Sequence, residues 1–222
     1  MMNASEHPPN VQSPKPLYFP EEAEMPETKW HLELRTALYQ ILKLAIGDRA
    51  TIGCDQFVYW DPTDPRACLA PDSFVRLGQK DEMFGSWKVW ERGAPHVAVE
   101  FVSEHDTKGE TWDIKFDKYR RLGVLELVRF EAEKPGAQLT VWDQVGGHLL
   151  NRELADPRRA DCRPLGLSWV VVDDADCGTA LRLADPATNT LLPKPAEKAE
   201  AAAERVRALE EELRRLEASK AP

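Results

Sequence analysis

One acidic side chain interrupts an apolar stretch in the middle of the chain. Glu100 lies within residues 95–103, a segment in which both alternating faces of a strand are otherwise apolar. That pattern is typical of a strand covered on two sides. A carboxylate buried without a partner is costly or takes up a proton. We therefore expect Glu100 to face a cation, a lysine or a strong donor, unless the strand is an edge and Glu100 is hydrated.

A lysine in the following helix is a candidate partner for Glu100. On a helix over residues 109–122, Lys115 falls in the stripe that should face the sheet. The other members of that stripe are apolar or aromatic: Trp112, Phe116, Tyr119 and Leu122. Lys118 lies further round the helix. The stripe predicts Lys115 near Glu100, although a lysine in such a position can also extend to solvent at the rim.

A second carboxylate precedes the Glu100 strand. Asp72 follows Pro71 and leads directly into an apolar run that ends at Leu77. A Pro-Asp pair is often only a turn. However, an aspartate and a glutamate from adjacent strands can share one Mg²⁺, which prefers oxygen ligands and keeps several waters. Asp72 and Glu100 are therefore candidate metal ligands, with Mn²⁺ as a substitute ion.

Other candidates carry weaker signals. His31 lies close to the apolar stripe of the first predicted helix, and Glu33 lies at its border, so structural roles are favoured for both. His96 shares a strand face with Glu100, where a hydrogen-bonded strand-end histidine is more common than a ligand. The chain contains no Walker loop, GxGxxG, GxSxG or HExxH motif.

These residues require a sheet and two helices to bring them together. Helical periodicity covers residues 30–46 and ends near Gly47, and the second helix covers 109–122 and is closed by Gly123. Strand-like runs cover residues 50–60, 68–77, 96–103, 124–131, 138–142, 148–154, 168–172 and 181–184. Gly146-Gly147 is a hairpin turn. The order predicts an α/β or α+β domain built on one central mixed sheet flanked by helices.

The two ends of the chain have different compositions from the middle. Residues 1–27 are rich in proline and glutamate and should form a flexible arm. Residues 193–222 form a separate tail, in which residues 196–219 are nearly all Ala, Glu, Arg and Leu, with apolar residues at alternating steps of three and four. The spacing predicts a C-terminal coiled-coil helix and a homodimer joined through it. A single solvated helix lying on the domain is the alternative. Residues 28–192 remain as the folded domain.

Composition narrows the class of protein. The net charge of -9 argues against a protein that coats nucleic acid with a broad basic surface, yet it allows an enzyme that meets DNA at a metal site. No run is apolar enough for a membrane span and no signal peptide begins the chain, so we expect a cytoplasmic protein. The four cysteines lack metal-site spacing and are expected as small buried or half-buried thiols.

The order of these motifs resembles a known family. Asp72 after a proline, then VEFVS, then a helix with K-x-x-x-Y followed by R-x-L-G-V, resembles the PD-(D/E)XK nuclease-like superfamily. Within it the chain is similar to the Uma family of restriction-endonuclease-like proteins over about residues 28–192, including the later LGLSW and LRLADPATNTLL segments. No single motif is stringent, and the order and spacing carry the resemblance.

The resemblance implies a restriction-endonuclease-like fold and a Mg²⁺-dependent phosphodiesterase site. Asp72 matches the metal-binding aspartate, Glu100 matches the acidic residue of the E-x-x motif, and Lys115 matches the migrated lysine of Uma-type sequences. Val102 stands where the general superfamily has its lysine. A second departure is the segment LELVR, residues 125–129, where the family tends to have an aromatic-rich strand ending in Asp-Pro.

Two functions remain open from the sequence. One is a metal-dependent endonuclease that hydrolyses phosphodiester bonds in nucleic acid, with DNA as the expected substrate and Asp72, Glu100 and Lys115 as catalytic residues. The other is a non-catalytic interaction or regulatory module that uses the same fold, which the acidic surface and the coiled-coil tail would suit. A shared environment for the carboxylates of Asp72 and Glu100, with Lys115 close by, would favour catalysis.

Overall fold

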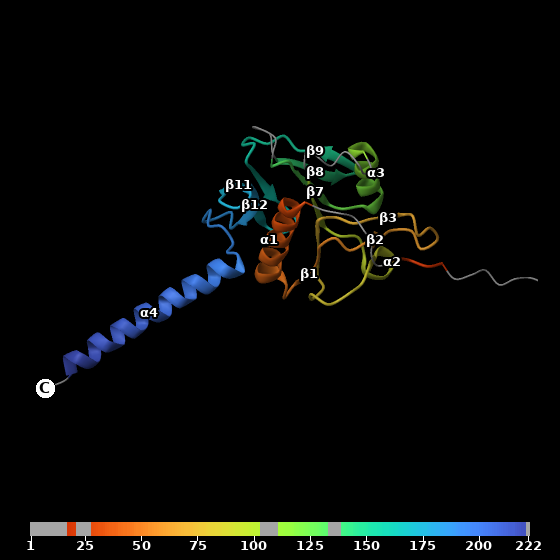
Figure 1. The fold of residues 1–222 in the computed structure, drawn as a ribbon. Coiled ribbons are helices and arrows are strands. Elements are labelled where there is room, and N and C mark those ends of the chain that lie inside the picture. The colour runs from red at the N-terminus through yellow and green to blue at the C-terminus, as the bar shows by residue number, and fades with distance from the viewer. Residues whose placement is uncertain (1–16, 21–27, 103–110, 133–138, 221–222) are drawn as a thin grey trace, which may run out of the picture.

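A central six-stranded sheet organises the protein (Figure 1). The computed structural model describes residues 17–20, 28–102, 111–132 and 139–220. The strands of the central sheet, in spatial order, are β1 (Ala50–Gly53), β4 (Ser73–Leu77), β6 (Val97–Phe101), β7 (Glu126–Phe130), β8 (Leu139–Val145) and β9 (His148–Asn151). β6 and β7 run parallel, and the other neighbours run antiparallel. The predicted central mixed sheet is confirmed.

Two helices cover the two faces of this sheet. Helix α1 (Lys29–Ile46) packs on the face that carries Val97 and Val99, and helix α3 (Trp112–Leu122) packs on the face that carries Ala98. Successive residues of a strand point to opposite faces, so α1 and α3 lie on opposite sides of β6. The two covering helices explain why both faces of the Glu100 strand are apolar in the sequence. The alternative that this strand is an edge is wrong, because β6 lies between β4 and β7.

Both helices begin and end close to the residues predicted from periodicity. The Thr28 hydroxyl caps α1 by accepting a hydrogen bond from the His31 N–H at 3.2 Å, and α1 ends before Gly47. Gly123 closes α3 with a left-handed φ of 79°, which glycine adopts without strain. The predicted start of this second helix at residue 109 lies outside the described residues.

Two predicted strands are each divided in the structure. The run over residues 50–60 forms β1 and β2 (Val58–Tyr59), because Asp55 adopts a left-handed φ of 70° and its N–H bonds the carbonyl of Pro71. The run over 68–77 forms β3 (Cys68–Leu69) and β4, separated by Pro71, which has no N–H to continue a ladder. The expectation of continuous strands there is wrong.

Two smaller sheets flank the central one, so the expectation of a single sheet is also incomplete. One contains β3, β2 and β5 (Trp87–Lys88), followed by the short helix α2 (Val89–Arg92). The other contains β10 (Arg159–Cys162), β11 (Leu167–Asp174) and β12 (Gly178–Ala184). The hairpin between β8 and β9 turns at Gly146 and Gly147, both with positive φ, as predicted.

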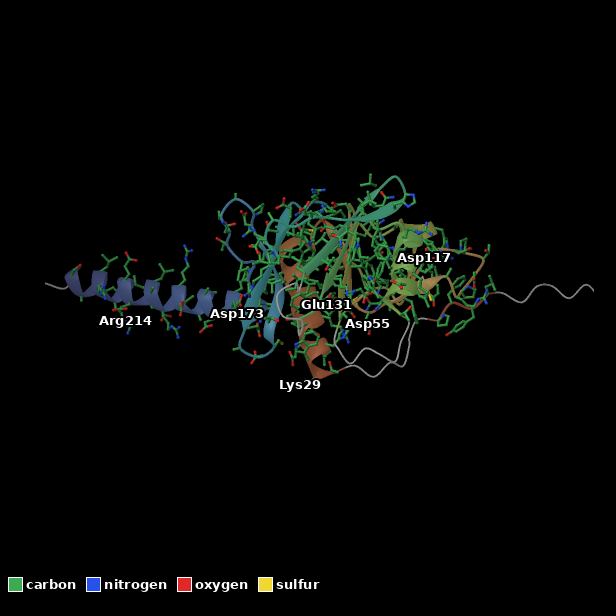
Figure 2. The ribbon with its side chains drawn as sticks, turned by 90° about the horizontal axis from the view of Figure 1, so that it is seen from above. Lys29, Asp55, Asp117, Glu131, Asp173 and Arg214 are labelled. Carbon is green, nitrogen blue, oxygen red and sulfur yellow. The ribbon has the colours of Figure 1, made fainter. Side chains whose placement is uncertain are left out.

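The C-terminal helix α4 (Pro195–Lys220) extends away from the body (Figure 1). Its first turn is anchored, because Glu197 accepts hydrogen bonds from Arg182 at 2.8 and 3.0 Å and from the N–H of Lys194. All the described side chains from Pro195 to Ser219 are exposed. Figure 2 shows them projecting from every side of the helix, with Arg214 labelled. The alternative in which this helix lies along its own domain is therefore wrong.

The structure describes a short part of the predicted N-terminal arm. Of the predicted arm, only residues 17–20 are described. There Phe19 packs edge-on against Tyr59, and the Tyr59 hydroxyl donates to the carbonyl of Pro20.

All four cysteines lie in described segments. Cys162 is buried, the other three are half-buried, and none forms a disulfide, as expected. No helix in the described ranges has the length and apolar composition needed to cross a membrane.

Candidate active site

The two candidate metal ligands lie at the same end of two neighbouring strands. β4 and β6 pair antiparallel, with Ser73 opposite Val99, so Asp72 and Glu100 occupy the next opposing positions. Asp72 immediately precedes β4, and Glu100 is the penultimate residue of β6. The long-range pairing of these strands therefore brings together two carboxylates that lie far apart in the sequence.

Each oxygen of the Asp72 carboxylate has a hydrogen-bond partner. Oδ2 accepts the backbone N–H of Phe101 at 2.7 Å, which ties Asp72 to the residue directly after Glu100. Oδ1 lies 2.7 Å from Nε2 of His31, which is in the first turn of α1. The Asp72 carboxylate is thus held between the end of β6 and the N-terminal turn of α1.

The Glu100 carboxylate is almost completely buried and is bound by two side chains of α3. Its residue is 1% exposed. Nζ of Lys115 donates to Oε2 at 2.5 Å, and the Tyr119 hydroxyl donates to Oε1. Lys115 and Tyr119 are four residues apart, so they share one face of the helix. The predicted contact between Lys115 and Glu100 is present, and the Lys115 ammonium group points at the Glu100 carboxylate.

Burial and charge determine the protonation of this cluster. Burial raises the pKa of Glu100 to about 7, the Lys115 ammonium opposes that rise, and the Asp72 carboxylate adds to it. The influence of Asp72 on this pKa shows that the two acids share one electrostatic environment. Burial and the neighbouring Glu100 carboxylate also raise the pKa of Tyr119 well above its usual value, so Tyr119 remains a donor.

An arginine lies on the neighbouring strand directly opposite Glu100. β6 and β7 pair with Glu100 opposite Arg129, so the two side chains leave the sheet on the same face. The guanidinium group of Arg129 lies 4.4 Å from the centre of the Trp112 ring and donates to Glu131 at 2.9 Å. The segment 125–129, which departs from the family pattern, therefore places the Arg129 guanidinium group, stacked on Trp112, on the strand beside Glu100.

Glu126, in the same departing segment as Arg129, has a structural role away from the site. It is fully buried and accepts hydrogen bonds from Arg152 at 2.7 Å, from the Trp169 indole at 2.8 Å and from the N–H of Arg163 at 3.2 Å. These partners belong to β9, β11 and the segments around them. Glu126 thus joins the central sheet to the β10–β12 sheet.

Two further candidates are placed outside the site. His96 accepts the N–H of Leu77 through Nδ1 at 2.9 Å and lies 3.3 Å from Arg76, consistent with the strand-end role favoured from the sequence. Burial and the nearby Arg76 lower its pKa. Glu33 is exposed on α1. Neither residue has a described contact with Asp72 or Glu100.

Two residues of the cluster were assigned other roles from the sequence. The sequence favours a structural role for His31, which contacts Asp72, and it gives Tyr119 a place in the apolar stripe and in the K-x-x-x-Y motif without a role in the site. The available signal for Tyr119 was its position one helical turn after Lys115. The signal for His31 was weaker, because its contact depends on where the start of α1 meets the ends of β4 and β6.

The donor set fits a hard divalent cation. Each carboxylate oxygen can accept two contacts and has one protein donor named above, so Asp72 and Glu100 can still offer oxygens to an ion. In the described ranges, no group of three or more His, Cys, Asp and Glu side chains could hold an ion. Two carboxylates completed by water suit Mg²⁺, which keeps several waters when bound.

The sheet, the covering helices and the paired acids define a nuclease-like α+β protein. The family model "Uma2: Putative restriction endonuclease" matches residues 14–171, and the chain belongs to this family. The match begins further upstream than expected and ends earlier, within β11. No curated protein matches the chain.

One solved structure is similar in part. It is titled "Crystal structure of a putative nuclease belonging to DUF820 from Anabaena variabilis ATCC 29413 at 1.96 A resolution". The two chains are 10% identical, with a TM-score of 0.41, over 58% of this chain and 70% of the other.

Proposed function

We propose that the protein is a metal-dependent endonuclease that hydrolyses phosphodiester bonds in DNA. The observation that carries the proposal is the convergence of Asp72 and Glu100 at one end of β4 and β6, with Lys115 bonded to Glu100. Burial raises the pKa of Glu100 to about 7 beside a lysine, and strongly perturbed carboxylates of this kind cluster at functional sites. Membership of the family supports the same reaction class.

In this proposal each residue of the cluster has a separate task. Asp72 and Glu100 would hold Mg²⁺, or Mn²⁺ in its place, which when bound polarises the phosphoryl oxygen and lowers the pKa of water. His31 and the Phe101 N–H orient the Asp72 carboxylate. Tyr119 orients the Glu100 carboxylate through Oε1.

Lys115 has the most direct role toward substrate. Its side chain is 32% exposed while its ammonium group contacts Glu100, so it can reach both the buried acid and a bound phosphate. A cation at that position stabilises the negative charge that develops on the phosphate in the transition state. Its positive charge also favours the ionised form of Glu100, which is the form that binds a cation.

A second function, a non-catalytic interaction module, is favoured by a different observation. In the absence of an ion, each oxygen of Asp72 and Glu100 already has a protein donor, so the cluster is also a satisfied structural network. The net charge of -9 and the projecting α4 suit a protein-binding role. In that case the carboxylates would hold β4, β6, α1 and α3 together without turnover.

Cleavage of supercoiled plasmid separates the two functions. Wild-type protein should nick or linearise the plasmid with Mg²⁺ or Mn²⁺ and be inactive with EDTA, while Glu100→Gln should be inactive with either ion. Lys118→Ala is a suitable positive control, because Lys118 lies further round α3 than the face on which Lys115 and Tyr119 contact Glu100. Equal cleavage by wild type and Glu100→Gln would identify a contaminating nuclease and reject this site. No cleavage together with no Mn²⁺ binding would favour the interaction module.

A further inference from the structure

The exposed helix α4 carries an apolar seam with no cover from its own body. The seam consists of Ala199, Ala202, Val206, Leu209, Leu213 and Leu216. Its four larger side chains, from Val206 to Leu216, are between 52% and 56% exposed. Beyond the anchored first turn the helix extends away from the domain (Figures 1 and 2). A stripe of this kind is stable in water when a second surface covers it.

We propose that the partner is the α4 helix of a second copy of the chain, and that the two helices run antiparallel. The steps of three and four residues are those of a coiled-coil seam, which is self-complementary. The direction of pairing follows from the sizes of the seam residues and from the charges that flank them.

The sizes of the seam residues favour the antiparallel direction. With the seams fully overlapped, an antiparallel pair places Ala199 against Leu216, Ala202 against Leu213, and Val206 against Leu209 of the second copy. Every layer then combines a small side chain with a larger one. A parallel pair would place alanine against alanine in the first two layers, where little apolar area is buried.

The flanking charges favour the same direction more strongly. Arg205 and Glu212 each precede a seam residue and lie on one flank, and Glu210 and Glu217 each follow a seam residue and lie on the other. In an antiparallel pair, residues of the same flank meet, so Arg205 of each copy faces Glu212 of the other. In a parallel pair, Arg205 faces Glu210, but Glu212 faces Glu217, which is repulsive.

Arg205 has no competing acidic partner on its own helix. The residues three and four positions away on either side are alanine or leucine. Its charge therefore gains no stabilisation from the intrahelical pairing that Arg215 has with Glu211. A second helix is the available source of a carboxylate for Arg205, and the antiparallel pair supplies one at this level of the seam.

An apolar groove at the root of α4 supports the same arrangement. It is lined by Ile41, Leu44 and Ala45 of α1 together with Leu192, Pro193 and Lys198. Lys198 directly precedes the first seam residue, Ala199. In the antiparallel register Leu216 of the second copy reaches Ala199, so the C-terminal end of that copy lies beside the groove. In a parallel pair both C-terminal ends lie at the far end, away from both grooves.

Charge reversals distinguish the two directions. Sedimentation equilibrium of the full chain should show a monomer–dimer equilibrium, and Leu209→Glu should abolish the dimer. Glu212→Arg should raise the dimer dissociation constant about tenfold. In the antiparallel pair this change places an arginine opposite Arg205, and symmetry repeats the repulsion at two places. Arg205→Glu should have the same effect, and the double variant Arg205→Glu/Glu212→Arg should return to within about twofold of wild type. Arg207→Glu and Glu204→Arg, on the outer face, are matched controls that should leave the constant unchanged.

Each contrary result overturns a stated part of the proposal. Tighter association of Glu212→Arg would show a parallel pair, because that change replaces the repulsion of Glu212 and Glu217 with attraction. A dimer that persists in Leu209→Glu would place the interface elsewhere. A monomer at all concentrations up to tens of micromolar would reject self-association and indicate that a different protein covers the seam. Circular dichroism of each variant checks that the helix is retained.

Discussion

Glu100 is the residue on which the proposed chemistry depends. Replacement by glutamine keeps the shape of the side chain and removes the buried charge. We expect Glu100→Gln to remain folded, to lose at least about a hundredfold in cleavage, and to bind Mn²⁺ much more weakly in calorimetry. Asp72→Asn should behave alike, because both acids are proposed ligands. A Glu100→Gln variant that binds Mn²⁺ as well as wild type would contradict this assignment.

Lys115 can be separated from its neighbour Lys118 on the same helix. Lys115→Ala removes the ammonium group from Glu100 and should slow cleavage about tenfold to a hundredfold while Mn²⁺ binding persists. Lys118→Ala removes the same type of side chain from a position further round α3 than the face that contacts Glu100, and should be nearly silent. Single-turnover rates at saturating Mn²⁺ give the comparison. Equal losses at both positions would mean that the assigned helix face is wrong.

The raised pKa of Glu100 predicts a pH dependence of both stability and ion binding. The folded, metal-free protein holds this proton up to about pH 7, because burial raises the pKa of Glu100 to about 7 from its usual 4.5. Between pH 4.5 and 7 the folded state therefore binds more protons than the unfolded state does. The free energy of unfolding should fall as pH rises through this range and then level off. Urea unfolding of wild type and Glu100→Gln across this range should show the difference growing toward pH 7.

Ion binding should change in the opposite direction. A cation competes with the Glu100 proton, so Mn²⁺ affinity should increase as pH rises from 6 to 8, by up to about tenfold per pH unit below 7. Tyr119→Phe removes a donor that lowers the pKa of Glu100, and should shift this increase to higher pH. Calorimetry at several pH values measures both, and a pH-independent affinity would show that Glu100 is not a ligand.

At the scale of elements, Glu126 provides a test of how the sheets are joined. Trp169→Phe removes one of its donors while keeping an aromatic ring, and leaves a buried carboxylate with fewer partners. We expect a loss of about 1–3 kcal/mol in the free energy of unfolding. Cleavage per folded molecule should be unchanged, because Glu126 lies outside the site. A parallel loss of activity would indicate that the joint between the sheets also positions Asp72 or Glu100.

Local patterns predicted the elements that carry the site. The apolar stripe containing Lys115 followed from helical periodicity, and the burial of Glu100 followed from a strand that is apolar on both faces. Both patterns are properties of contiguous residues. The helix over residues 30–46 and the hairpin at Gly146 were predicted for the same reason, since a period or a turn sequence identifies each of them.

Contacts between distant elements were not accessible in the same way. The His31–Asp72 contact joins residues far apart in the chain and depends on how α1 crosses the sheet. The division between β1 and β2 arises at Asp55, whose φ of 70° is uncommon for a residue other than glycine. The strand β10 alternates Arg159 and Asp161 with Ala160 and Cys162, but it is only four residues long and contains Ala and Asp, which are depleted in strands, so the sequence alone does not predict it.

For the whole molecule, the anchoring of α4 predicts where the tail can be removed. Arg182 is 4% exposed and both of its terminal nitrogens bond Glu197. A chain ending at residue 198 keeps this pair and should have the unfolding free energy of the full-length monomer. A chain ending at residue 194 removes the half-exposed Glu197 carboxylate from Arg182, which keeps only the Leu192 carbonyl as acceptor, and should lose about 1–3 kcal/mol. Equal stability of the two truncations would show that this pair contributes nothing.

The length of α4 gives the proposed assembly a fixed spacing. In an antiparallel pair the two helix roots are separated by roughly the full helix, on the order of 38 Å at 1.5 Å per residue. Each body lies beyond the root of its own helix, because α4 extends away from the domain (Figure 1). The pair of helices would therefore act as a rigid spacer that prevents the two bodies from touching. Removing one heptad from the middle of α4 would bring the two roots about 10 Å closer together.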